Sequence, residues 1–63
     1  MENNNAYNLI NQLTQESKSL WRIVNVYMKE ASDDEQKAFW QKLAADKETT
    51  LVELKALIKK MLA

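Results

Sequence analysis

The sequence predicts an all-α fold in which two long antiparallel helices, an αα-hairpin, dimerise into a four-helix bundle. Three observations favour this fold class. The 63 residues contain no Gly and no Pro, the residues that punctuate strands and loops. A single turn signal interrupts the chain, and apolar residues recur at helical spacing on both sides of it. A chain with so few turn residues is expected to form long helices, and few of them.

The turn signal is EASDDEQ, residues 30 to 36. Ser32 followed by Glu35 has the pattern of a capping box, in which the hydroxyl accepts from the third helical amide while the carboxylate accepts from the cap amide. Asp33 and Asp34 suit the positive end of a helix dipole. We therefore expect one helical-hairpin domain over residues 1–63, with residues 1–4 frayed, a first helix over about 5–31, a turn over about 31–33 and a second helix over about 33–62.

An inward row of residues, here called the seam, repeats along each helix at alternating spacings of three and four, as in coiled coils. In the first helix the expected seam is Ala6, Ile10, Leu13, Ser17, Leu20, Val24, Tyr27 and Ala31. In the second helix it is Trp40, Leu43, Lys47, Thr50, Leu54, Leu57 and Met61. Folding about a short turn sets residues opposite each other when their numbers sum to about 67, so Leu20 faces Lys47 and Ser17 faces Thr50.

Three of the expected seam residues are polar: Ser17, Lys47 and Thr50. Ser and Thr hydroxyls can donate to the carbonyl four residues earlier in a helix. A lysine can lie along apolar neighbours while its ammonium group reaches water. Because polar residues inside a bundle fix its pairing and oligomeric state, we expect these three to form a polar core layer with that role.

A second apolar stripe flanks the seam on each helix. A lone hairpin buries one stripe per helix, and a wider apolar arc is typical of a helix with two neighbours. A chain this short cannot form disulfides without Cys, so it needs another source of stability, such as a partner subunit. We expect a homodimer whose interface comprises Tyr7, Leu9, Trp21, Ile23, Met28, Phe39, Leu51 and Ile58. The relative orientation of the two hairpins stays open, and another helical protein is the alternative occupant of these stripes.

Composition excludes most other functions. Without His or Cys, the chain lacks the usual ligands of zinc, haem and iron–sulfur sites and the usual catalytic base and thiol nucleophile. Nine basic residues balance nine acidic ones, so no net charge attracts nucleic acid or anionic lipid. No run approaches the roughly 20 apolar residues of a membrane span, and the start lacks the pattern of a signal peptide. We expect no enzyme, cofactor, metal, small-molecule substrate or membrane contact, and a cytoplasmic location.

The stretch AFWQKLAADKETTLVELKALI, residues 38 to 58, resembles the metal-bearing helix of ferritin-like and rubrerythrin-like proteins in its LA-x-D-K-E sequence followed by spaced leucines. The resemblance implies half of a four-helix bundle. In that family an inward Glu on one helix and an inward Glu-x-x-His on the next hold a di-iron centre. Those positions correspond here to Ser17, Lys47 and Thr50, none of which can replace those ligands. The resemblance thus implies a degenerate ferritin-like protein that has lost metal binding.

The outer row of the first helix is free of acidic residues. It comprises Asn4, Asn8, Asn11, Gln15, Lys18, Arg22, Asn25 and Lys29. Amide and basic side chains in a row suit contacts with phosphates, base edges and 2′-hydroxyls. Rop-type RNA-binding hairpins are similar in length and in their acid-rich turn, which makes them an architectural analogue. A regulatory RNA-binding hairpin using Asn11, Gln15, Lys18, Arg22 and Lys29 is therefore one alternative, although a solvated surface is the simpler interpretation.

One local feature departs from a regular helical pattern. Ile23, Val24 and Val26 place three β-branched residues in mid-helix, each at a cost of a few tenths of a kcal/mol. Val26 is expected on the outer face of the first helix, where a simple hairpin gives it no role. Taken together, the sequence predicts a non-enzymatic, self-associating helical hairpin that serves as an oligomerisation or protein-interaction module.

Overall fold

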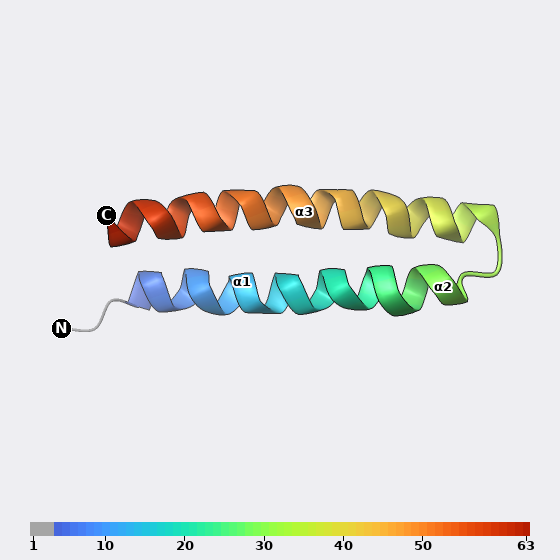
Figure 1. Cartoon of the computed structure of the whole chain (residues 1–63), viewed down its shortest axis with the longest axis horizontal. Helices are drawn as coiled ribbons and strands as arrows, with labels where there is room; N and C mark the ends of the chain where they lie inside the picture. Colours follow the sequence, from blue (N-terminus) through green and yellow to red (C-terminus); the bar gives the residue numbers. More distant parts are fainter. Residues whose placement is uncertain (1–3) are drawn as a thin grey trace.

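The computed structural model describes residues 4–63, which form two long helices lying side by side and joined by a short turn (Figure 1). The first helix comprises α1 (Asn4–Arg22), the π-helical segment η1 (Ile23–Tyr27) and α2 (Met28–Glu30). The second is α3 (Asp34–Leu62), which runs antiparallel to it. The described part of the chain contains no strand. The expected all-α hairpin is confirmed.

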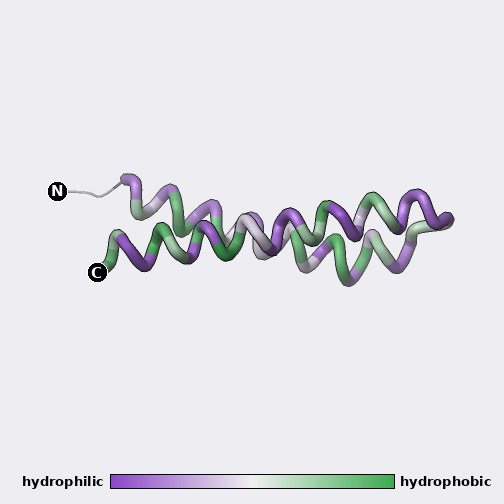
Figure 2. Tube along the Cα trace, turned by 90° about the horizontal axis from the view of Figure 1, so that it is seen from above, coloured by the Kyte–Doolittle hydropathy of each residue, from purple (hydrophilic) through white to green (hydrophobic). Residues whose placement is uncertain are grey.

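The helix bounds lie within one residue of those expected from the sequence. Of the four residues expected to fray, residues 1–3 fall outside the described residues, and Asn4 is the first residue of α1. The principal extents are 50 × 15 × 12 Å, so the hairpin is a rod. Seen from above, the two helices cross near mid-length (Figure 2). A crossing of this kind keeps the inward rows of two helices in contact along their length.

The turn is capped one residue later than the sequence pattern suggested. Asp33, with an extended backbone, caps α3, and its carboxylate accepts a 2.7 Å hydrogen bond from the Gln36 amide. The Gln36 side chain in turn accepts from the Ser32 amide and hydroxyl at 3.3 and 3.4 Å. The prediction of Ser32 as cap and Glu35 as its partner was wrong. An aspartate caps a helix as well as a serine does, so the cap falls on Asp33, and Gln36 accepts from the residue before the cap rather than from the cap amide.

The β-branched cluster coincides with η1. Its wider turn is seen where the Met28 amide donates to the Ile23 carbonyl, five residues earlier rather than four. A π-helical turn of this kind accommodates one residue more than an α-helix with the same ends. Residues before η1 are therefore rotated by about one position relative to a continuous α-helix through residues 4–30.

This rotation changes the seam of α1. At the turn the expected register holds, since the Tyr27 and Trp40 rings, whose numbers sum to 67, lie with centroids 4.9 Å apart. Before η1, Ala6, Leu13 and Leu20 are half-buried as expected, but at every second step the inward residue is one earlier than expected. The half-buried or buried residues are Leu9, Glu16 and Ile23, whereas the expected Ile10, Ser17 and Val24 are exposed.

The seam of α3 also differs from the expected one. Ala44 and Leu54 are buried, and Leu51 and Ile58 are half-buried. The expected seam residues Leu57 and Met61 are exposed, so their placement was wrong. With Ile23 of η1, Ala44 and Leu54 are the buried apolar residues of the described chain. The list is short because each helix is covered along one side only.

A deletion tests whether η1 is the cause of the shifted register. Removing the exposed Asn25 should let η1 close into an α-helix without moving the faces on either side. We expect far-UV circular dichroism and thermal stability close to those of the parent chain. As a matched control, removal of the exposed Gln15 from the middle of α1 should rotate residues 4–14 by about 100° and destabilise the hairpin strongly. Equal losses from both deletions would contradict the assignment.

Candidate functional site

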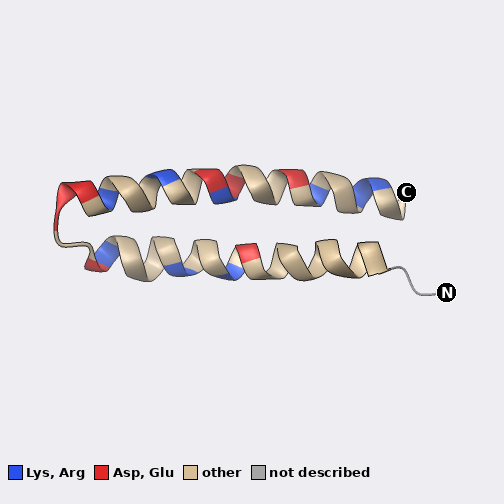
Figure 3. Cartoon of the chain, turned by 180° about the vertical axis from the view of Figure 1, so that it is seen from behind, with Lys and Arg blue, Asp and Glu red and all other residues tan. Residues whose placement is uncertain are grey.

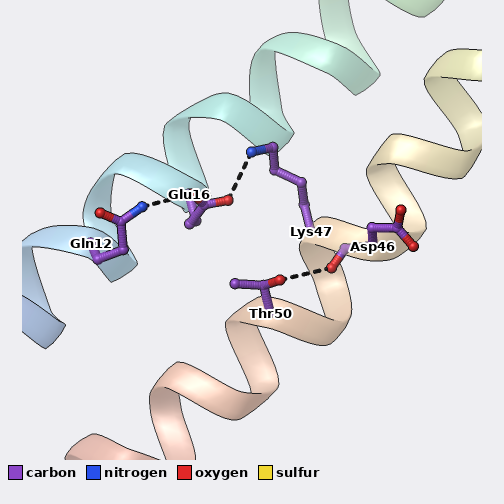
Figure 4. Close-up of polar contacts among 5 residues, drawn as sticks. All are labelled: Gln12, Glu16, Asp46, Lys47 and Thr50. Atoms are coloured by element: carbon purple, nitrogen blue, oxygen red, sulfur yellow. Dashed lines mark hydrogen bonds and ion pairs between the residues drawn. The ribbon is translucent and has the colours of Figure 1, made fainter.

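An interhelical ion pair lies near the middle of the hairpin. The Lys47 ammonium donates to Glu16 Oε1 at 2.8 Å, and the Gln12 amide donates to Glu16 Oε2 at 2.8 Å (Figure 4). The two charged side chains are only 21% and 17% exposed, for lysine and glutamate respectively. Both carboxylate oxygens are thus bonded, which offsets the cost of partial burial.

The surroundings of Glu16 lower its pKa below the ordinary value of 4.5. The hydrogen bond from Lys47 is the main cause, and the Gln12 amide and the positive charge of Lys47 act in the same direction. Partial burial opposes them, because it disfavours the charged carboxylate. The carboxylate therefore stays charged and paired at neutral pH.

This lowered pKa has a consequence for stability. The pKa of Glu16 is lower in the folded state than in the unfolded state. The contribution of Glu16 to stability is therefore fully present above its unfolded-state pKa, and it is lost as pH falls through its folded-state pKa. We expect denaturation midpoints measured from pH 6 down to about pH 3 to fall less steeply in Glu16→Gln than in the parent chain. The exposed Glu48→Gln variant, which keeps Glu16, should retain the parent profile. A Glu16→Gln profile parallel to the parent's would contradict the argument.

The three residues expected to form a polar core layer differ in their exposure. Lys47 and Thr50 are half-buried, and the Thr50 hydroxyl donates to the Asp46 carbonyl at 3.0 Å (Figure 4). Ser17 is exposed, and Glu16 takes its place. Sequence reasoning missed Glu16 because a continuous helix turns it to the flank. The β-branched cluster was the available signal, since it lies on the segment that shifts the register.

The same shift bears on the ferritin-like resemblance. The inward position assigned to Ser17 is occupied by a carboxylate, Glu16, but its partner is an ammonium group rather than a metal ligand. Within residues 4–63, no group of three or more His, Cys, Asp or Glu residues is placed to hold a metal ion. The chemistry of this layer is that of an ion pair and its hydrogen bonds.

The eight residues expected at a dimer interface divide into two sets. Ile23 is buried in the hairpin itself, and Leu9, Met28, Leu51 and Ile58 are half-buried. Ile23 therefore has no free surface for a second copy, so its assignment to the interface is corrected. The exposed members are Tyr7, Trp21 and Phe39, at 67%, 63% and 57%. The Phe39 ring packs edge-on against Trp40 at 5.0 Å.

The five residues considered for RNA contact, Asn11, Gln15, Lys18, Arg22 and Lys29, are all exposed. Asn25, in the same row, donates its amide to the Trp21 carbonyl at 2.9 Å. Figure 3 shows that charged residues are absent from the first turns of α1 and sparse over the rest of it. The row thus presents amides at one end and separate positive charges at the other.

Two concave regions lie on the surface of the hairpin. The larger, of about 540 Å³, is a groove at the open end lined by Leu13 of α1 and by Lys55, Ile58, Lys59, Leu62 and Ala63. The smaller, of about 190 Å³, lies at the turn end and is lined by Tyr27, Glu30, Ala31, Gln36 and Trp40. Both are open to solvent. Neither contains the nucleophile and base pair that a hydrolytic site would need.

Comparison with known proteins finds no matching family model, no matching curated protein and no matching solved structure. What the fold defines is a class: a two-helix hairpin with an interhelical ion pair at its centre. Over residues 4–63, no helix combines the length and the apolar character needed to cross a bilayer.

Proposed function

We propose that the protein is a non-enzymatic module that works by self-association, with two hairpins forming a four-helix bundle. The observation that carries this proposal is the shortage of buried apolar surface. Three apolar side chains are buried in the described chain, while nine large apolar ones are exposed. Single exposed apolar residues are ordinary, but this proportion in so small a domain favours an interface.

The dimensions of the hairpin support the same proposal. Its accessible surface is 5061 Å², whereas a compact monomer of its mass exposes about 4,200 Å². Its radius of gyration is 14.6 Å, against about 11 Å for a compact chain of this length. The surplus of several hundred Å² is comparable with the roughly 800 Å² that each partner contributes to a standard interface.

Sedimentation equilibrium over a wide concentration range tests the proposal. We expect a mass of twice 7.4 kDa and a denaturation midpoint that rises with protein concentration, because association stabilises the folded state by mass action. Trp21→Glu, which places a charge on an exposed aromatic position, should shift the equilibrium towards monomer. Asn11→Glu on the outer row is the matched control and should leave it unchanged. A well-folded 7.4 kDa monomer at every concentration would refute self-association and leave a different helical partner as the occupant.

RNA binding is a second candidate, supported by the exposure of the whole acid-free row on the first helix. In this case Arg22 and Lys18 would contact phosphates, and the amides of Asn11 and Gln15 would contact base edges or 2′-hydroxyls. Binding to structured RNA should weaken with rising salt and with Arg22→Glu. The absence of binding at low salt would exclude this function and leave self-association untouched.

The ferritin-like resemblance is compatible with the proposed bundle as an architecture. On that proposal the chain is a derivative in which Lys47 and Glu16 neutralise each other where a metal centre would be held. Titration with Fe²⁺ is expected to change neither the absorbance nor the thermal stability of the protein.

A further inference from the structure

Apolar residues that the hairpin leaves exposed or half-buried form one row on each helix. On α1 and η1, Ile10, Trp21 and Val24 follow helical spacing with the exposed Ser17 between them. On α3, the half-buried Leu51 and Ile58, which border the hairpin's own seam, and the exposed Leu62 follow the same spacing. These six apolar residues, with Ser17, are called the docking face below.

The two rows belong to the same side of the helix pair. Gln12 and Glu16 of α1 and Lys47 and Thr50 of α3 are seen together on one flank (Figure 4). In each helix the docking-face residue follows by one position, about 100° further round: Ser17 after Glu16, and Leu51 after Thr50. In an antiparallel pair of right-handed helices, a step of one residue turns towards the same flank on both helices. Ser17 and Leu51 therefore lie on one flank, opposite the flank of Glu16 and Thr50.

The groove at the open end supports this placement independently. It is lined by Leu13 of α1 together with Ile58 and Leu62 of α3. The groove therefore opens on the flank that carries the α3 row. It gives the docking face a concave apolar end rather than a flat one, which favours close packing against another apolar surface.

The two ends of the hairpin carry opposite charge. Residues 29–37 at the turn contain four acidic and two basic residues, whereas residues 53–62 at the open end contain three lysines and one glutamate. Figure 3 shows the acidic residues at the turn and lysines towards the C-terminal end of α3. Two hairpins packed in parallel would place like charges together at both ends, while antiparallel packing places the acidic turn of each beside the basic end of the other. Such complementarity selects orientation even where each exposed pair is weak.

We propose that the docking face is occupied by a second copy of this chain, packed antiparallel so that the turns lie at opposite ends of the dimer. This inference rests on the self-association proposed above. It adds which face of the hairpin is buried in the dimer and how the two copies are oriented. The two-fold axis lies in the interface, perpendicular to the helices, and brings α1 against α1 of the second copy. Ser17 is the midpoint of residues 4–30, so the two Ser17 side chains meet at the axis. Ile10 of each copy then lies opposite Val24 of the other.

Cysteine variants test this arrangement, because the parent chain contains no Cys. On mild oxidation at low concentration, Ser17→Cys should form a covalent dimer rapidly, since a disulfide needs Cα atoms within about 7 Å. Gln15→Cys, two residues away on the outer row, is the matched control and should remain largely monomeric on a denaturing gel. Circular dichroism of each reduced variant checks that the hairpin is folded.

Spin labels at the turn give a second, independent measurement. Labels on Ser32→Cys should lie more than about 40 Å apart in the antiparallel dimer, the length of a 29-residue helix. In a parallel dimer they would lie within about 20 Å, since packed helices are separated by 8–10 Å. A dimer by sedimentation with short label distances, or without Ser17→Cys cross-linking, would overturn this inference alone. A folded monomer would overturn the proposed function as well.

Discussion

Replacing Ile23 by alanine is expected to remove a large fraction of the free energy of unfolding of the hairpin. Ile23 is 2% exposed and is the largest fully buried side chain of the described residues. Truncating a buried isoleucine to alanine costs about 2–5 kcal/mol. A 63-residue domain has a total stability of roughly 3–9 kcal/mol. Urea denaturation followed by circular dichroism at 222 nm measures the loss directly.

Val52→Ala is the matched control for this prediction. Val52 is also β-branched and lies in a helix, but it is 68% exposed, so its truncation should change stability by less than about 0.5 kcal/mol. Similar losses from both variants would contradict the placement of the core at η1. The comparison also separates the loss of packing from the loss of a β-branched residue.

Removing both members of the ion pair is expected to stabilise the hairpin, while removing one destabilises it. Lys47→Leu alone leaves the Glu16 carboxylate half-buried without its main partner, at an expected cost of about 1–3 kcal/mol. Glu16→Leu with Lys47→Leu replaces the pair by apolar packing and should exceed the parent chain by about 1 kcal/mol, or roughly 4–8 °C in Tm. A double-mutant cycle uses four chains: the parent, Glu16→Leu, Lys47→Leu and the double variant. It gives the coupling free energy between the two side chains.

The same four chains test whether the pair fixes the oligomeric state. If it does, the double variant should be more stable yet sediment as a mixture of species, because an apolar layer accepts several packings. An equally discrete dimer would refute a role in specificity. Coupling energy near zero would show that the pair contributes nothing to stability either.

The architecture of the hairpin could be predicted from sequence because its signals are local and agree with one another. The absence of Gly and Pro, the acid-rich turn and the spacing of apolar residues all indicate two helices. The position of the cap was harder, since Ser32 and Asp33 are equally good capping residues. The energies that separate such alternatives are too small for a sequence pattern to decide.

The candidate site depended on a one-residue shift that periodicity cannot detect. Heptad spacing placed Ser17 inward, and the structure places Glu16 there, because η1 holds one residue more than an α-helix would. The cluster of Ile23, Val24 and Val26 marked the segment but did not reveal its geometry. The error spread to the interface, where Ile23 was assigned to the surface and is buried.

The π-helical segment also adds a residue to the first helix that a heptad count from the turn does not allow for. Counted back from Tyr27, the inward row keeps Ala6, Leu13 and Leu20 of the expected seam, but it contains Leu9, Glu16 and Ile23 instead of the other three. A heptad assignment carried through this segment will therefore misplace every second inward position of the first helix. Any redesign of this surface, or any alignment of another hairpin with it, has to treat η1 as a one-residue insertion and restart the count beyond it.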